Sequence, residues 1–134
     1  MTLAMEQLEA RIRERLAEQR RLVGELLSRR EQLQGSLFER YALCGKPGCC
    51  CRGGERHGPY YVLSTRGRQG SAFTYLPPGR VRQARSQVRA GREFRLGLKR
   101  LQRLNQELVA LLRRVQAGRL RASARDLRSL SASA

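Results

Sequence analysis

The chain carries, at residues 44–57, the stretch CGKPGCCCRGGERH, which holds all four of its cysteines and its single histidine. The spacing Cys44-x4-Cys49-x-Cys51-x5-His57 supplies three thiolates and one imidazole, and the intervening glycines and proline let the backbone fold around a point. Such ligands at such spacings are typical of tetrahedral structural zinc sites. We therefore predict one Zn²⁺ bound by these four residues. The ion would organise a segment with too little apolar material to fold by itself.

The remaining cysteine, Cys50, is surplus in this scheme. Three consecutive ligands on one ion would strain the backbone, whereas Cys49 and Cys51, two positions apart, are free to converge. Two alternatives stay open, namely two disulfides, or free thiols with His57 simply ending a turn. Adjacent cysteines rarely bridge each other, because a disulfide requires separated Cα atoms.

The first residues of the chain indicate whether its cysteines meet an oxidising or a reducing environment. Met1–Ala10 contains Glu6 and Glu9 and no apolar core of a secretory signal peptide. A cytoplasmic, reducing location is therefore expected, and it disfavours disulfides. No run approaches the roughly 20 apolar residues that cross a bilayer, so no membrane partner is expected.

The charge of the chain is strongly positive and unevenly placed. Lysine and arginine number 28 against 11 acidic residues, a net charge of +17. Residues 1–34 are nearly neutral, with seven basic and six acidic side chains, whereas residues 79–134 hold fifteen and three. Such an excess predicts an acidic partner, of which nucleic acid is the first candidate, bound through the carboxy-terminal half. A GC-rich genome would favour arginine over lysine, but it does not explain the missing acids.

The pattern along the chain predicts four segments. The first segment, residues 1–35, is predicted to form an amphipathic helix from residue 3 to residue 34, because its apolar residues recur at steps of three and four. Residues 36–78 hold the cysteine loop and a β-hairpin, with strands at 60–65 and 72–76 and a further short strand possible at 38–43. Residues 79–117 read as a long basic, leucine-striped helix. Gly118 is a plausible C-cap, and 118–134 read as a flexible basic tail.

Leucines in the second half of the long helix follow a heptad pattern. A single asparagine among leucine a and d positions fixes register and oligomer number in coiled coils. The alternative is a solvated break in an amphipathic stripe. The pattern predicts that Leu101, Leu108 and Leu112 pack against another helix, of the same chain or of a second copy. The a and d positions are Leu98 (a), Leu101 (d), Asn105 (a), Leu108 (d), Leu112 (a) and Val115 (d), and Leu104 and Leu111 widen the apolar stripe.

Two groups of cations are candidate nucleic-acid contacts. The first lies on one side of the long helix, at a spacing that suits phosphates along a groove; a solvated helix face is the plainer alternative. It comprises Arg82, Arg85, Arg89, Arg92, Arg95, Lys99 and Arg103. The second, expected to cluster at one end of the molecule, joins the metal loop to the hairpin tip. It comprises Lys46, Arg52, Arg56, Arg66 and Arg68.

The hairpin is rich in aromatic residues, which have two readings. Tyr60, Tyr61, Phe73 and Tyr75 could stack on unpaired bases. They could equally form the hairpin's own core against a helix. A hairpin alone is marginally stable in water, so it needs a zinc ion at its base and a helix against one face.

No constellation of residues points to an enzyme. The acidic residues are few and unpaired, and Gly45-Lys46-Pro47-Gly48 lacks the length and hydroxyl of a phosphate-binding loop. A catalytic zinc site would need an open ligand position and a base, and Glu55 is the only candidate base. We therefore expect no catalysis and no small-molecule substrate.

The central motif resembles that of an uncharacterised family of short prokaryotic proteins. The resemblance is carried by Cys-Gly-Lys-Pro-Gly-Cys-x-Cys at 44–51 and His-Gly-Pro-Tyr-Tyr at 57–61, and it extends over about residues 8–112. It implies Cys44, Cys49, Cys51 and His57 as the matching positions, with a departure at Cys50. Members are often encoded near transposases and other mobile-element genes. The resemblance supplies no activity.

The sequence as a whole predicts a mostly helical α+β protein in which two long, coiled-coil-like helices flank a small zinc-stapled β-hairpin. We expect a cytoplasmic, nucleoid-associated homodimer that binds nucleic acid, DNA before RNA, as an accessory or regulatory factor of a mobile element. The alternatives are an RNA or ribonucleoprotein-binding protein and a coiled-coil structural adaptor.

Overall fold

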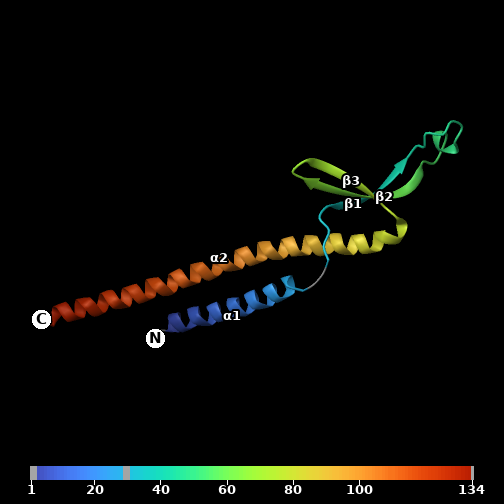
Figure 1. Cartoon of the computed structure of the whole chain (residues 1–134). Helices are drawn as coiled ribbons and strands as arrows, with labels where there is room; N and C mark the ends of the chain where they lie inside the picture. Colours follow the sequence, from blue (N-terminus) through green and yellow to red (C-terminus); the bar gives the residue numbers. More distant parts are fainter. Residues whose placement is uncertain (1–2, 29–30, 134) are drawn as a thin grey trace. The chain divides into compact units, whose positions relative to one another are not determined.

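A computed structural model describes residues 3–28 and 31–133 of the chain (Figure 1). Along the chain lie α1 (Leu3–Leu26), β1 (Ser36–Ala42), η1 (Cys50–Arg52), β2 (His57–Gly67), β3 (Gly70–Leu76), η2 (Pro78–Arg80) and α2 (Val81–Ala132). Two compact units are present. The helical unit comprises Met1–Ser28 and Leu96–Ala134, and the sheet unit comprises Arg29–Arg95. The expected mostly helical α+β class is confirmed.

Both helices differ in length from the prediction. The first ends at Leu26 rather than near residue 34, and its last turn is closed by the Ser28 hydroxyl, which donates to the Glu25 carbonyl oxygen (2.7 Å). Residues 29 and 30 of the predicted helix lie outside the described ones. The second helix continues through Gly118 to Ala132, so the predicted C-cap and flexible tail are wrong. Leucine, alanine and arginine, which are frequent after Gly118, all favour helix.

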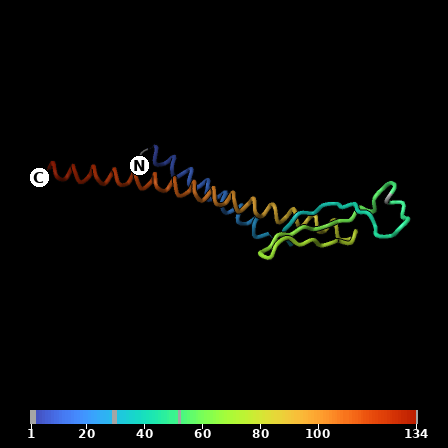
Figure 2. The backbone as a smooth tube through the Cα atoms, turned by 90° about the horizontal axis from the view of Figure 1, so that it is seen from above, coloured from blue at the N-terminus to red at the C-terminus, as the bar shows by residue number. Residues whose placement is uncertain are grey.

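In the helical unit, α1 runs alongside the middle of α2, and the carboxy-terminal turns of α2 extend beyond the start of α1, as Figure 1 and Figure 2 both show. The covered face of α1 repeats at steps of three and four residues, as expected of a coiled-coil seam. These positions are Met5, Leu8, Ile12, Arg15, Gln19, Leu22 and Leu26. The matching positions of α2 are Gly97, Leu101, Leu104, Leu108, Leu111, Val115 and Gly118.

This seam corrects the predicted heptad register. Leu101, Leu108 and Val115 are covered as expected, but the other set of seam positions lies one residue earlier than predicted. Leu104 and Leu111 are buried, whereas Leu112 is 53% exposed. All three predicted a positions, Leu98, Asn105 and Leu112, lie beside the seam, because α1 covers the positions one residue nearer the amino terminus of α2.

Polar residues interrupt the seam at its middle. The Gln19 side-chain amide donates to Asn105 Oδ1 (2.7 Å). Arg15 Nε lies 3.1 Å from Glu107 Oε2 and its Nη1 lies 3.0 Å from Glu18 Oε2. Asn105 therefore does take a partner across the seam, although it lies at the edge and not at the centre.

Glycines close the two ends of the seam. A Cβ atom at Gly97 would lie 2.6 Å from Leu26 Cδ2, and one at Gly118 would lie 2.8 Å from Met5 Cε. Both glycines thus make room for an apolar side chain of α1. Gly118 acts as a packing position inside a helix, which explains why the helix passes through it.

In the sheet unit, the predicted hairpin is part of a three-stranded antiparallel sheet with the order β1-β2-β3. The pairing of Phe38 with Val62, and of Val62 with Tyr75, puts β2 in the centre. β2 and β3 meet at a tight turn between Gly67 and Gly70. The possible strand at 38–43 is therefore an integral edge strand, which gives the hairpin the third strand that its stability requires.

One face of the sheet packs on the first turns of α2. Alternation along β2 directs Tyr61 and Leu63 to this side, and the Arg85 guanidinium lies 5.9 Å from the centroid of the Tyr61 ring. Leu63 and, on α2, Val81, Ala84 and Val88 are buried. This side is the core of the unit.

The segment before β1 also packs on α2 within the sheet unit. The Leu33 backbone N–H donates to the Gln87 carbonyl oxygen (3.0 Å), and Gln87 Nε2 donates to Glu31 Oε2 (2.9 Å). A Cβ atom at Gly91 would lie 2.9 Å from the Leu33 carbonyl oxygen. Only glycine admits so close an approach of two backbones.

The corrected register predicts different effects for two neighbouring leucines of α2. Leu108→Ala removes a side chain from the seam and should lower the free energy of unfolding by about 2–5 kcal/mol. Leu112→Ala is the matched control, because its side chain is exposed, and it should cost less than about 1 kcal/mol. Urea unfolding followed by circular dichroism measures both variants. Equal losses would contradict the register.

Candidate metal centre

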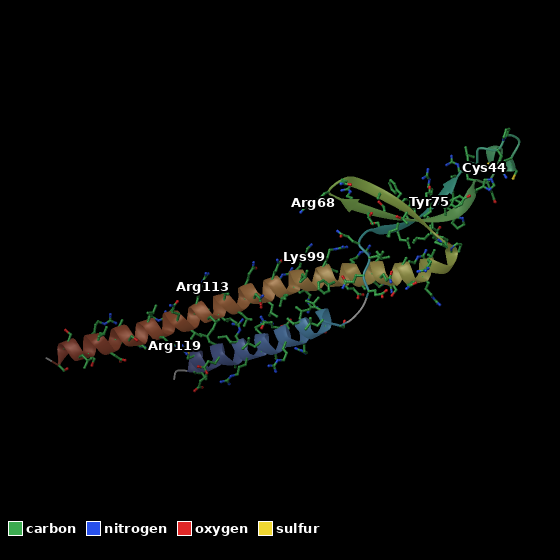
Figure 3. All side chains as sticks on the ribbon, viewed as in Figure 1. Cys44, Arg68, Tyr75, Lys99, Arg113 and Arg119 are labelled. Carbon is green, nitrogen blue, oxygen red and sulfur yellow. The ribbon has the colours of Figure 1, made fainter. Side chains whose placement is uncertain are left out.

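The loop between β1 and β2 gathers the cysteines and the histidine. Cys44 follows the end of β1, Cys49 directly precedes η1, Cys51 lies within η1 and His57 is the first residue of β2. Pairing of Ala42 with His57 brings the two ends of the loop together. Figure 3 shows Cys44 in this loop, beyond the end of the strands.

Gly58 fits the backbone closely at the point where β2 begins. Its φ angle is +143°, and a Cβ atom there would lie 2.8 Å from the Arg40 carbonyl oxygen. Both conditions favour glycine. The residue after His57 therefore has to be small for β1 to pass this close, and His57 stays at the mouth of the loop.

The four predicted ligands converge on one point. Cys44 Sγ lies 3.5 Å from Cys51 Sγ, and Cys49 Sγ lies 3.2 Å from His57 Nε2. All four ligand atoms lie within 4.8 Å of one another. Zinc–sulfur bonds of about 2.3 Å in a tetrahedron separate two sulfurs by about 3.8 Å. The group can therefore hold a metal ion with little movement.

The surroundings of the four residues suit a structural site. Cys51 is buried, and Cys44, Cys49 and His57 are half-buried. Three thiols and one imidazole are soft or borderline donors, which favour zinc over the hard cations calcium and magnesium. Four protein ligands fill a tetrahedral site and leave no open position for a substrate.

Hydrogen bonds tune the thiols in opposite directions. The backbone of Cys51, then His57 and the other two thiols, lower the pKa of Cys49 to about 6. The backbone of Lys46 lowers the pKa of Cys44, but the thiols of Cys49 and Cys51 together with burial outweigh it, so the pKa is raised. The lowered pKa of Cys49 favours its thiolate, which is the form that binds a metal.

The side chain of Cys50 does not join the group of four ligand atoms. It is exposed, and Cys50 is not among the residues whose ligand atoms converge. None of the four cysteines forms a disulfide. The placement agrees with Cys50 as the surplus cysteine.

The second predicted group of cations does not form one cluster. Lys46 and Arg56 belong to the metal loop, whereas Arg66 and Arg68 lie at the turn between β2 and β3. The eleven residues of β2 separate the two places, a span of about 33 Å. Figure 3 shows Cys44 and Arg68 at opposite ends of the sheet. The side chain of Arg52 lies outside the described part of the chain.

The predicted basic stripe of α2 is exposed in both units. Arg82, Arg85, Arg89, Arg92 and Arg95 belong to the sheet unit, and Lys99 and Arg103 belong to the helical unit. One of them has a role in packing, since Arg85 Nη2 lies 3.8 Å from Glu39 Oε1 and its guanidinium lies over Tyr61.

Members of the stripe other than Arg85 also have acidic neighbours. Arg82 and Arg89 border a hollow of the sheet unit that Glu31 and Glu93 also line. The positive charge of the stripe is thus partly offset at this end. Arg92 and Arg95 do not border the hollow.

Two residues of β1 are candidate functional residues that the sequence patterns above do not indicate. Phe38 and Arg40 alternate with Leu37 and Glu39, and the pairing with β2 places them on the side of the sheet that faces away from Tyr61. A period of two in 36–42 is the signal that could have found them. It becomes useful only once the strand is known to pair with β2.

Comparison with known proteins identifies a family but no function. The family described as Domain of unknown function (DUF6788) matches residues 5–86, which include α1, the metal loop and the sheet. The match covers more than half of the chain, so the chain belongs to this family. Searches of the curated proteins and of the solved structures found no match. Membership of an uncharacterised family is thereby confirmed, whereas its motif and mobile-element neighbourhood stay predictions.

The geometry of the loop predicts different results for two adjacent cysteines. Cys49→Ser removes a converging thiolate, so the purified protein should lose its metal and the strand signal of residues 36–76. Cys50→Ser is the control and should keep both. Elemental analysis and circular dichroism measure the two effects. A metal-free wild-type protein with an unchanged spectrum and melting temperature would contradict the prediction.

Proposed function

We propose that this is a zinc-containing nucleic-acid-binding protein. In this proposal the ion occupies the Cys44, Cys49, Cys51 and His57 group and is structural. It fixes the loop to the sheet and takes no part in a reaction. The donor set supports zinc, because three thiolates and an imidazole are the ligands that structural zinc sites use.

The observation that carries nucleic-acid binding is the exposed positive charge. The chain has a net charge of +17, and the seven cations of the α2 stripe are all exposed. Arginine binds phosphate oxygens in a bidentate manner, and release of condensed counterions favours such contacts. The stripe would bind the phosphate backbone and would carry little sequence information.

DNA is the polymer proposed first, because cations at regular steps of three and four residues along a helix suit the regular phosphates of a duplex. The mobile-element setting that the sequence resemblance implies would fit an accessory or regulatory role on cytoplasmic, nucleoid DNA, in the form of a homodimer. RNA is the second candidate, and a specific observation favours it. Phe73 and Tyr75 are exposed on the sheet, as expected of a protein that binds unpaired bases.

Four arginines of the stripe provide the test. Replacing Arg82, Arg89, Arg92 and Arg95 by glutamine should flatten the log–log dependence of duplex affinity on salt by roughly three to four units, since each contact contributes about 0.9. Arg85 is left intact because it packs on the sheet. Fluorescence anisotropy over a range of salt concentrations, with duplex DNA and structured RNA in parallel, measures the slopes.

The matched control carries the same loss of charge on the nearly neutral first helix. Replacing Arg11, Arg13, Arg20 and Arg21 by glutamine should leave the slope within about one unit of the wild-type value. Binding that does not depend on salt would contradict the proposal. So would an absence of binding to either polymer at low salt, which would leave the structural adaptor.

A further inference from the structure

The outer face of the sheet, directed away from α2, is aromatic and exposed. Register and alternation place Phe38 of β1, Tyr60 of β2, and Phe73 and Tyr75 of β3 around Val62 on this face. The four rings are 40%, 44%, 62% and 55% exposed, in that order, whereas Val62 is only 1% exposed. The rings thus cover the centre of the sheet and present their own surfaces to solvent. We call these four residues the aromatic face.

The rings form two perpendicular pairs. The centroids of Phe38 and Phe73 are 6.2 Å apart with an interplanar angle of 89°, and those of Tyr60 and Tyr75 are 6.5 Å apart with an angle of 81°. In an edge-to-face pair, the edge of one ring covers one face of the other. Three of the four ring faces in each pair are therefore not covered by the partner ring. Flat partners can stack on such faces.

The rest of this face is basic or neutral. Arg40 Nη1 donates to Tyr75 Oη (2.9 Å), and alternation from Tyr60 places Arg66 on the same side, opposite Ser71. The acidic residue of β1, Glu39, lies on the other side with Arg85. The face thus offers ring surfaces for stacking and positive charge for an anionic group, which is not the make-up of a purely apolar surface.

We propose that the aromatic face is a stacking platform for the unpaired bases of a single-stranded nucleic acid. The inference rests on the proposed function and names the form of nucleic acid that this site takes. Bases stack on Phe73 and Tyr75, the most exposed rings, and Arg40 and Arg66 bind the phosphates that link them. Stacking needs no particular base, because every base has a π-face. A duplex keeps its bases covered, so this site selects unpaired segments.

Two oligonucleotides of equal length separate stacking from charge. One is oligothymidylate, and the other is an abasic strand with the same phosphates and no bases. The wild-type protein should bind oligothymidylate more tightly, by about 5-fold to 150-fold for each base that stacks. The double variant Phe73→Leu, Tyr75→Leu should bring the ratio of the two affinities close to one. Fluorescence anisotropy at one fixed salt concentration measures both affinities.

Two further variants keep the result specific to the rings. Tyr41→Leu removes an exposed tyrosine of β1 that is not one of the four rings of the aromatic face, and it should leave the ratio unchanged. Tyr75→Phe keeps the ring and loses the hydroxyl bonded to Arg40, so it should retain most of the preference for bases. Metal content and circular dichroism of each variant establish that the sheet is folded.

The possible failures are distinguishable. A wild-type ratio near one, with steep salt dependence intact, would overturn the stacking platform and leave the proposed function standing. A double variant that changes from dimer to monomer in sedimentation while its ratio stays at the wild-type value would make the face a contact between copies, and would also overturn it. No binding of either strand at low salt would overturn this inference together with the proposed function.

Discussion

The convergence of three thiols and one imidazole is the constraint on which the sheet unit depends. The loop that carries them runs from the end of β1 to the start of β2 and contains little apolar material. Closing such a loop costs conformational entropy, and three short strands with one exposed aromatic face have a limited core to offset it. A metal bound to the four ligands would supply this missing stability directly. It would also fix β1 as the neighbour of β2, and so hold Phe38 and Arg40 on the outer face.

In the helical unit, the main constraint is on the alignment of α1 with α2. An apolar seam alone tolerates more than one register, because leucines are frequent on both sides of it. The bond between Gln19 and Asn105 and the ion pair between Arg15 and Glu107 are satisfied only in one alignment of the two helices. Polar residues within a seam are a known means of selecting one register. The packing of Leu26 on Gly97 and of Met5 on Gly118, at the two ends of the seam, favours the same alignment.

The parts of the fold and of the metal site that depend on local residue spacing could be predicted from the sequence. The ligand group follows from the positions of few, chemically distinctive residues, and the strands and helices follow from periodicity. The phase of the heptad did not follow, because Leu104, Leu111 and Leu112 are equivalent until a partner helix selects one stripe. Gly118 has the sequence features of a helix end, although its role is to admit Met5. The aromatic rings could not be assigned to core or surface, since a strand shows two faces and only the packing of α2 decides which is covered.

The two ends of β2 are held by different means, and this makes the sheet asymmetric. His57 begins the strand inside the ligand group, whereas Gly67 ends it at a turn whose two central residues, Arg68 and Gln69, are exposed. With a metal in place, the first end would be tethered through side chains as well as backbone, whereas the second end is held by the ladder and by the turn to β3. Local opening of β2 at His57 would therefore require release of a metal ligand, whereas opening at Gly67 would require only the loss of backbone hydrogen bonds.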